Sequence, residues 1–336
     1  MANIVKDGTI NLQSAPTISA YAAAAGKKEG EGPLAEYFDY LSDDVTLGEN
    51  SWEKSESKLQ QYAFTNALSK GKFSESDMDF LFAGDLLNQC VASAYGARDT
   101  SIPFYGLFGA CSTMAESLGL ASIFVDSGAA INAAAVTSSH FCSAERQFRL
   151  PVNYGGQRTP TAQWTATAAG CAIVSPHGAP PYVKAVTVGK IKDMGITDAN
   201  NMGAAMAEAA HDTISRHLAN MGQSIDAFDL ILTGDLGKVG SDILTELFQK
   251  DNIDISEKHN DCGLMLYDLE KQDVHAGGSG CGCSASVLCG YILPEIAAGR
   301  LKNVLFAATG ALMSPTIVQQ GESIPGISHA VHISAF

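Results

Sequence analysis

The sequence predicts an α/β protein in which one structural unit is used twice. Residues 76–87 (SDMDFLFAGDLL) and 226–237 (DAFDLILTGDLG) match at a constant offset of 150 positions. Farther along the chain, Cys111 matches Cys283 and Thr137 matches Thr309, both at an offset of 172. Two ordered blocks indicate an internal duplication. Strands alternate with helices inside each copy, a pattern typical of parallel sheets with right-handed crossovers.

Each copy begins with a helix and a buried strand. Residues 52–70 and 206–221 have helical patterns, and Gly71 and Gly222 stand where helices commonly end. The apolar run that follows each helix ends in Gly-Asp, which suits a buried parallel strand that reaches a loop.

A turn and a second helix follow in each copy. The segment around Cys111 predicts a strand, a tight turn and a helix that continues to Gly128, followed by the strand-like AAAVTSS. The second copy repeats this order from Gly282 to the strand-like VLFAATG. Because the offset grows from 150 to 172, the second copy contains an insertion of 22 residues, which we place within 250–274.

Length and repeat together predict two similar halves, 1–178 and 179–336. The least regular stretch, 140–164, lies within the first half, between the repeated elements of the two copies. It is rich in turn-forming, polar and aromatic residues, so we expect a long lid or binding loop there.

Composition excludes several classes of protein. The 336 residues include 21 Lys+Arg and 36 Asp+Glu, a formal charge of −15, without the basic clusters that nucleic-acid binding needs. Hydrophobic residues make up 46% and charged residues 17%, which excludes a disordered chain. We expect neither a signal peptide nor a transmembrane segment, since no run approaches about 18 apolar residues. The eight scattered cysteines favour reduced, buried thiols over a disulfide framework.

Cys111 is the main candidate for chemistry. At the start of a helix, the helix dipole and free N–H groups favour a thiolate and can also bind a carboxylate. The structural alternative is a small thiol packed at the turn. Catalysis would also need a base, and His140 and His275 are the histidines nearest to the converging strand ends; a structural role is the favoured interpretation for each. Asp235 could accept a proton, although an ordinary carboxylate is a poor base for a thiol.

The turn GGSGCGCS at 277–284 contains Ser279 and leads into a helix. It lacks the Lys-Ser/Thr of a phosphate loop and fits no GxGxxG frame. Cys281 and Cys283 stand one residue apart without a second Cys or His pair, so we expect no metal site here.

The 140–164 stretch carries a possible anion site. It contains Arg146, Arg149 and Arg158, and it ends at Trp164. Arginine binds carboxylates in a bidentate manner, and an indole face can stack on a planar ring. The alternative is ordinary ion pairing with acidic residues such as Glu145.

These features together resemble the thiolase superfamily, and more closely the stage V sporulation protein AD family of endospore formers. The blocks that carry the closer resemblance are GKKEGEGPLAE (26–36), AGDLLNQ (83–89), GLFGACST (106–113), AERQFR (144–149), PTAQWT (160–165), DMGI (193–196), NMGAAMA (201–207), TGDLGKVGS (233–241), DCGLMLYD (261–268) and SPTIVQQGESIPGI (314–327).

The resemblance implies a thiolase fold, a duplicated five-layer α/β/α/β/α arrangement with two mixed sheets. It also implies binding of dipicolinic acid (pyridine-2,6-dicarboxylate), with calcium as a possible companion and with no other cofactor. The implied partners are integral membrane proteins of the same spore transport system, and a second copy in a homodimer. The implied place is the forespore or spore interior, peripheral to the inner membrane.

The chain departs from the catalytic members of the superfamily. Cys111 matches their nucleophile, but Asp235 stands where the synthase III type has a catalytic histidine. Ser279 stands where those enzymes have asparagine and thiolases have histidine, and residues 308–311 lack the second thiolase cysteine. Because general acid–base catalysis contributes roughly 10²–10⁴-fold, loss of these partners predicts a protein that is not an enzyme.

We therefore expect a degenerate active-site pocket that holds dipicolinate. The expected ligand-binding residues are Cys111, His140, Arg146, Arg149, Arg158, Trp164, Asp235 and Ser279. One alternative is an acyltransferase or thioesterase that acts on acyl-CoA through Cys111. Another is a scaffold with a vestigial pocket that docks a membrane channel.

Overall fold

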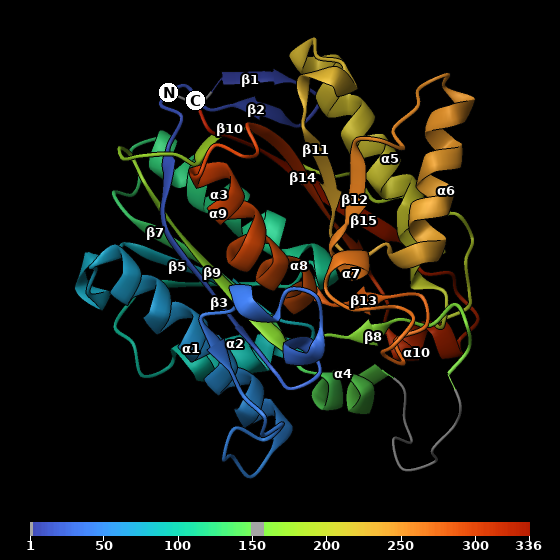
Figure 1. The fold of residues 1–336 in the computed structure, drawn as a ribbon, viewed down its shortest axis with the longest axis horizontal. Coiled ribbons are helices and arrows are strands. Elements are labelled where there is room, and N and C mark those ends of the chain that lie inside the picture. The colour runs from blue at the N-terminus through green and yellow to red at the C-terminus, as the bar shows by residue number, and fades with distance from the viewer. Residues whose placement is uncertain (1–2, 149–157) are drawn as a thin grey trace.

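The computed structural model describes residues 3–148 and 158–336, which fold around two half-sheets that meet at one strand pair (Figure 1). The first half-sheet has the order β3-β9-β7-β5-β6 and the second has the order β12-β11-β14-β15-β10. Their bounds are β3 Thr17–Ala25, β9 Ala168–Ser175, β7 Ala133–Ser139, β5 Phe80–Gly84, β6 Phe104–Leu107, β12 His259–Asp261, β11 Leu230–Thr233, β14 Asn303–Ala311, β15 Gly326–Ser334 and β10 Tyr182–Thr187. A single pair, Tyr182 with Thr17, joins the two, so the two mixed sheets of the prediction are continuous.

The expected parallel pairing holds only in part of each half-sheet. β5 is parallel to both β6 and β7, and β11 is parallel to both β12 and β14. The next strand inward is antiparallel in each half: β9 beside β7, and β15 beside β14. The sheets are therefore mixed, as the thiolase resemblance implied, and the Gly-Asp sequences stand at the ends of the parallel strands β5 and β11.

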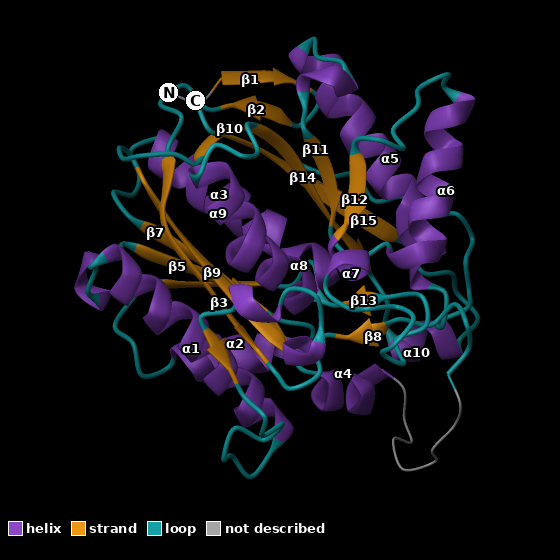
Figure 2. Ribbon diagram, viewed as in Figure 1, coloured by secondary structure: helices purple, strands orange, loops and turns teal. Residues whose placement is uncertain are grey.

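Helices complete five layers, seen in Figure 2 as helix groups outside and between the two half-sheets. The outer helices of the first half are α1 (Trp52–Gly71) and α2 (Val91–Ala97). The outer helices of the second half are α5 (Met202–Met221) and α6 (Gly237–Lys250). The central layer holds α3 (Thr113–Asp126), α8 (Cys281–Val287) and α9 (Leu293–Ala297).

Small residues allow the central helices to lie close to the strands. The core between the half-sheets combines α3 and α8 with alanines of β7 and β9. Gly170 of β9 shows how close this packing is, because a Cβ there would lie 2.3 Å from the carbonyl oxygen of Ala285 in α8. Separate clusters of buried side chains lie beneath α1 and beneath α5.

The predicted helix ends were right at one position and wrong at the other. Gly222 follows α5 with φ of 62° and donates to backbone carbonyls of the last turn, as expected of a C-cap glycine. After α1 the left-handed position is Lys72, with φ of 57°, and Gly71 belongs to the helix. Gly71 is required for packing instead, since a Cβ there would lie 2.5 Å from the Phe73 ring and 2.7 Å from Ala20.

The remaining elements are short. Within the predicted insertion lies α7 (Cys262–Met265), followed by a loop that leads to β13 (Gly278–Ser279). β13 is parallel to β8 (Trp164–Thr165), and together they form a separate two-stranded ribbon. β4 (Tyr40–Leu41) is parallel to β3, and α10 (Pro315–Gln319) follows β14.

The 140–164 stretch is not a continuous loop. α4 (Phe141–Phe148) forms directly after β7, and its last residue is followed by 149–157, which lie outside the described residues. α4 is held to α1 by a hydrogen bond of 2.6 Å from the Ser143 hydroxyl to Glu56 Oε2. The prediction of a loop was wrong here because the polar and turn-forming residues of the stretch obscure the pattern of an eight-residue amphipathic helix.

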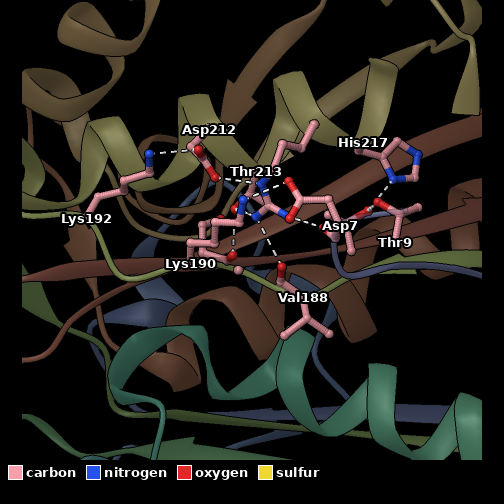
Figure 3. Close-up of polar contacts among 12 residues, drawn as sticks. Asp7, Thr9, Val188, Lys190, Lys192, Asp212, Thr213 and His217 are labelled. Atoms are coloured by element: carbon pink, nitrogen blue, oxygen red, sulfur yellow. Dashed lines mark hydrogen bonds and ion pairs between the residues drawn. The ribbon is translucent and has the colours of Figure 1, made fainter. Parts of the chain in front are cut away.

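An N-terminal ribbon crosses to the second half. β1 (Asn3–Lys6) and β2 (Thr9–Asn11) form a hairpin, and β2 pairs with β10 (Figure 1). Figure 3 shows the polar contacts that fix it to α5. Arg216 donates to the Asp7 carbonyl at 2.8 Å, to the Val188 carbonyl at 3.1 Å and to the Asp212 carboxylate at 2.7 Å.

The thiols agree with a reduced protein. All eight cysteines are free, and all but Cys142 are buried. Among the described helices, none is long and apolar enough to cross a membrane.

Candidate functional site

A cavity of about 270 Å³ opens where the strand ends of the two halves meet. Cys111 and Ser279 lie at its floor, and both side chains are almost fully buried. α4 contributes Ala144, Glu145 and Phe148 to one wall. The residues after β14, from Leu312 to Ser314, contribute to the opposite wall, with Met202 from the start of α5. Most of the lining is apolar, and Glu145 is the charged side chain among the described lining residues.

Cys111 lies in a sharp turn between β6 and α3. Ala110 has φ of 51°, in the left-handed region that a side chain rarely adopts, and residues 110–112 form one 3₁₀ turn before α3 begins. Gly310 of β14 packs directly against this turn, since a Cβ there would lie 2.7 Å from the Gly109 carbonyl oxygen. The turn therefore directs Cys111 into the cavity at a cost in local backbone strain.

Asp235, just after β11, lies directly beneath the cavity floor and is fully buried. Its Oδ2 accepts hydrogen bonds from the Ser279 hydroxyl at 3.0 Å and the Gly280 N–H at 2.9 Å. Its Oδ1 accepts a hydrogen bond from the Thr309 hydroxyl at 2.9 Å. The Cys111 thiol lies beside this carboxyl group, close enough for each to influence the pKa of the other. Three of the expected residues, Cys111, Asp235 and Ser279, are therefore brought together.

This network does not favour a thiolate at Cys111. Burial raises the pKa of the thiol well above its ordinary value, and the neighbouring Asp235 carboxyl group raises it further. The expectation from the helix N-terminus was wrong because desolvation and a like charge outweigh the helix dipole. Burial also raises the pKa of Asp235 to about 6, with its hydrogen bonds opposing that shift.

His140 lies outside the cavity lining and has both ring nitrogens engaged. Nε2 is 2.8 Å from the Val45 carbonyl, and Nδ1 accepts from the Cys142 N–H at 3.2 Å. Burial lowers its pKa, so the ring is neutral near pH 7. His275 is 2.8 Å from the Thr159 carbonyl and 2.9 Å from the Asp273 carboxylate. Both positions match the structural alternative for these histidines.

The arginines are separated from one another. The Arg146 guanidinium pairs with Glu53 of α1 and lies over the Trp52 ring, 5.3 Å from its centroid. This matches the alternative of ordinary ion pairing, with Glu53 as the partner. Arg149 lies outside the described residues.

Arg158 and Trp164 do lie together, but behind the floor of the cavity. The guanidinium is 4.6 Å from the ring centroid, and Phe141 stacks on the indole at 3.8 Å. Thr165 of the same short strand lines the cavity, and alternate residues of a strand point to opposite faces. Lys28, which the sequence did not single out, is also 4.2 Å from the Trp164 ring centroid.

Two groups of buried carboxyl residues were also missed. Glu56 accepts hydrogen bonds from Ser138 and Ser143, and its pKa is raised well above the ordinary value by burial and by Asp85. Glu29 accepts a hydrogen bond from the Tyr267 hydroxyl, and burial raises its pKa. Apart from its place in the 26–36 block, no sequence signal distinguishes Glu29, and Glu56 is one of several polar residues in its helix.

The described residues offer no preformed cluster of metal-binding side chains. Among them, no group of three or more His, Cys, Asp or Glu side chains is arranged to hold a metal ion.

The chain is similar in sequence to proteins of a known family. The family model described as "Stage V sporulation protein AD" matches residues 6–334. The chain is 46% identical over 314 residues to stage V sporulation protein AD of Bacillus subtilis (strain 168), with 94% of this chain and 93% of the relative covered.

Solved structures of lower identity share the fold. 3-Oxoacyl-[acyl-carrier-protein] synthase III from Aquifex aeolicus VF5 aligns with a TM-score of 0.57 at 14% identity, over 95% of this chain and 99% of that one. Cerulenin-bound OleA from Xanthomonas campestris aligns with a TM-score of 0.60 at 13% identity, over 95% and 96%. These likenesses establish a thiolase-type fold.

Proposed function

The chain belongs to the stage V sporulation protein AD family, and we propose that it binds dipicolinic acid in the cavity above Cys111. In this role it supports movement of the compound into and out of the spore. Calcium accompanies the ligand where the ligand supplies part of the coordination. The site binds without turning over a substrate.

The observation that carries the proposal is the partner of Cys111. A cavity opens at the Cys111 turn, but the thiol lies beside the Asp235 carboxyl group, and its pKa is raised. A nucleophile needs a lowered pKa or an adjacent base of suitable strength. An open cavity whose thiol is held protonated is suited to binding.

The cavity suits a small planar ligand. Pockets for drug-sized molecules occupy roughly 300–1,000 Å³, so about 270 Å³ fits a single substituted ring. Phe148 and Met202 offer apolar surface to the ring, and Cys111 and Ser279 offer polar atoms at the floor. Arg149 follows the wall helix α4 directly in the sequence and is our candidate for a cation that meets the second carboxylate.

We propose a second copy of the chain as one partner, at the edge strand β6. β6 pairs on one side with β5 and ends the strand path, and Phe104 and Tyr105 are exposed. Pairing of two β6 edges would cover these rings and continue the sheet. Light scattering should show a dimer, and Tyr105→Glu should dissociate it.

The second proposed partner is an integral membrane protein of the same spore system, which holds the protein at the inner membrane from the forespore side. Because no described helix could cross the bilayer, attachment would depend on that partner. Flotation with partner-containing vesicles, against protein-free vesicles, tests this attachment.

Calorimetric titration with pyridine-2,6-dicarboxylate tests the ligand. Wild-type protein should bind saturably, and Ala144→Phe, which fills the cavity from α4, should weaken binding at least about tenfold by occupying the ligand's space. Arg146→Ala is the matched control on the same helix, because Arg146 pairs with Glu53. No heat with wild type, or equal affinity in Ala144→Phe, would overturn the proposal. Vesicle attachment without ligand heat would favour the scaffold alternative.

One contact favours the acyltransferase alternative. The Cys111 thiol lies beside Asp235, whose pKa of about 6 leaves it ionised at neutral pH and able to accept the proton. In that reaction Cys111 Sγ attacks the acyl carbonyl and the thiol of coenzyme A leaves. Mass spectrometry after incubation with acyl-CoA would reveal an adduct, absent from Cys111→Ser, if this alternative holds.

A further inference from the structure

The cavity floor presents an unusual surface to an anion. Cys111 and Ser279 are the polar lining side chains beside the Asp235 carboxyl group, and the Ser279 hydroxyl donates its hydrogen to that group at 3.0 Å. A hydroxyl has one hydrogen to give. While Asp235 is ionised, Ser279 therefore directs lone pairs, and no hydrogen, toward the cavity.

This arrangement opposes a bound carboxylate. Its oxygens would face the acceptor side of Ser279, with the buried charge of Asp235 directly behind it. Charges in a site shielded from water interact strongly. A dianion such as dipicolinate would therefore meet repulsion at the polar end of the cavity.

One proton on Asp235 reverses the direction of these bonds. A protonated carboxyl group carries an O–H donor, and its Oδ2 lies 3.0 Å from Ser279 Oγ. Once that O–H donates to Ser279, the Ser279 hydrogen is released to point into the cavity. The Gly280 N–H can donate to the remaining acceptor capacity of Asp235, so the change needs no movement of the backbone.

We propose that ligand binding in this cavity takes up one proton from solvent onto Asp235, which converts the floor from a hydrogen-bond acceptor to a donor for a carboxylate. This inference rests on the proposed function and adds how binding is regulated. The anionic ligand is then bound over a cavity floor in which Asp235 is neutral. Loss of the Asp235 proton leads to release of the ligand.

The groups that face Asp235 from every side are acidic or neutral. Cys111 of the elbow, Cys262 of α7, and Cys281 and Cys283 of α8 are buried thiols with raised pKa values. Asp261, at the end of β12, raises the pKa of Asp235 through its charge. Across the cavity, the charged group among the described lining residues is Glu145.

This environment allows Asp235 to take up a proton near neutral pH. Burial raises the pKa of Asp235 to about 6, so protonation at pH 7 is only modestly unfavourable. If the bound state requires the proton, affinity should be nearly constant below pH 6. Above pH 6 it should fall by roughly tenfold per pH unit, since the ligand then has to stabilise the protonated form.

The test is calorimetry with disodium pyridine-2,6-dicarboxylate at pH 6, 7 and 8, each in two buffers of different ionisation enthalpy. We expect uptake of close to one proton at pH 8 and an affinity about 50-fold weaker than at pH 6. Asp235→Asn, which is neutral at every pH, should bind at pH 8 about as tightly as wild type does at pH 6. Glu116→Gln is the control, because Glu116 is another partly buried carboxyl group of raised pKa, on α3.

The outcomes separate the two proposals. No binding heat at any pH would refute the proposed function itself. Saturable binding without proton uptake, or with the same pH dependence in Asp235→Asn as in wild type, would overturn this inference and leave the binding function standing. The proton count uses wild-type protein, so it decides the question even if Asp235→Asn does not fold.

Discussion

The Ser279 hydroxyl lies 3.0 Å from Asp235 Oδ2, at the place where the thiolase resemblance puts the catalytic partners of a nucleophilic cysteine. This hydrogen bond gives each of the two buried polar groups a partner. The Cys111 thiol lies beside the same carboxyl group. Asp235 thus holds a buried hydrogen-bond network, with Ser279, Gly280 and Thr309, at the floor of an open cavity.

Cys111 should react slowly with alkylating reagents. Its pKa is raised well above the ordinary value, and it is buried, whereas Cys142 of α4 is partly exposed. Since the thiolate is the reactive form, we expect iodoacetamide at pH 7 to modify Cys142 at least about tenfold faster. Peptide mass spectrometry over time measures both rates. Preferential modification of Cys111 would instead indicate an activated nucleophile.

Arg216→Ala should loosen the N-terminal ribbon. Its guanidinium, 12% exposed, joins Asp212 of α5 to the backbone carbonyls of Asp7 and Val188 (Figure 3). Loss of hydrogen bonds from a largely buried charged group should lower the free energy of unfolding by about 1–3 kcal/mol in urea denaturation.

Arg300→Ala is the matched control for that variant. Arg300 pairs with Glu295, but its side chain is 63% exposed, so the cost should stay below about 1 kcal/mol. Equal losses in the two variants would show that Arg216 does not anchor the ribbon.

The buried histidines should destabilise the protein in acid. Burial lowers the pKa of His217 to about 3 and that of His332 to about 4. Unfolded histidine takes up a proton near pH 6.5, so between pH 6.5 and 4 the unfolded state binds more protons than the folded state. Stability is therefore complete above pH 6.5 and falls with decreasing pH, by up to roughly 1.4 kcal/mol per unit for each group.

His217→Gln tests this pH dependence. Removing this one titrating group should reduce the loss of unfolding free energy between pH 7 and 5 by about 1–2 kcal/mol. His211→Gln is the control, because His211 is partly exposed and 2.8 Å from Asp251. An unchanged pH dependence in His217→Gln would contradict the role of burial.

Gly282→Ala should disturb the first turn of α8. A Cβ there would lie 2.2 Å from the Ala168 carbonyl oxygen and 2.7 Å from the Ser139 N–H nitrogen, and backbone atoms cannot move aside easily. We expect a loss of about 1–3 kcal/mol or more in urea denaturation. Gly30→Ala, whose Cβ would meet the Leu41 side chain at 3.3 Å, should be far milder. Equal effects would refute the packing argument.

The sequence predicted the repeated elements well, for a physical reason. Buried strands such as AAAVTSS and VLFAATG are runs of apolar and small residues without a charge, and β7 and β14 match them within one residue at each end. The glycine at 222 was interpreted correctly from its chain position. Gly71 was interpreted wrongly, because glycine is needed there for tertiary packing. Phe73 and Ala20, which pack against it in the fold, leave no room for a Cβ atom.

The site was harder to predict than the fold. Matching offsets identified Cys111 and Asp235, because strand ends converge in space. The sequence could not reveal that Arg146 would pair with Glu53, or that Trp164 would face away from the cavity. Those outcomes depend on which face of α4 and which face of β8 points toward the cavity floor. Both elements are too short for the sequence pattern to show this.

A crystal structure of the protein with pyridine-2,6-dicarboxylate, prepared at pH 6, tests the central claim most directly. We predict ligand density in the cavity between α4 and the residues after β14, with one carboxylate against Cys111 and Ser279. Density beside Arg158 and Trp164 with an empty cavity, or a covalent adduct on Cys111, would contradict the claim.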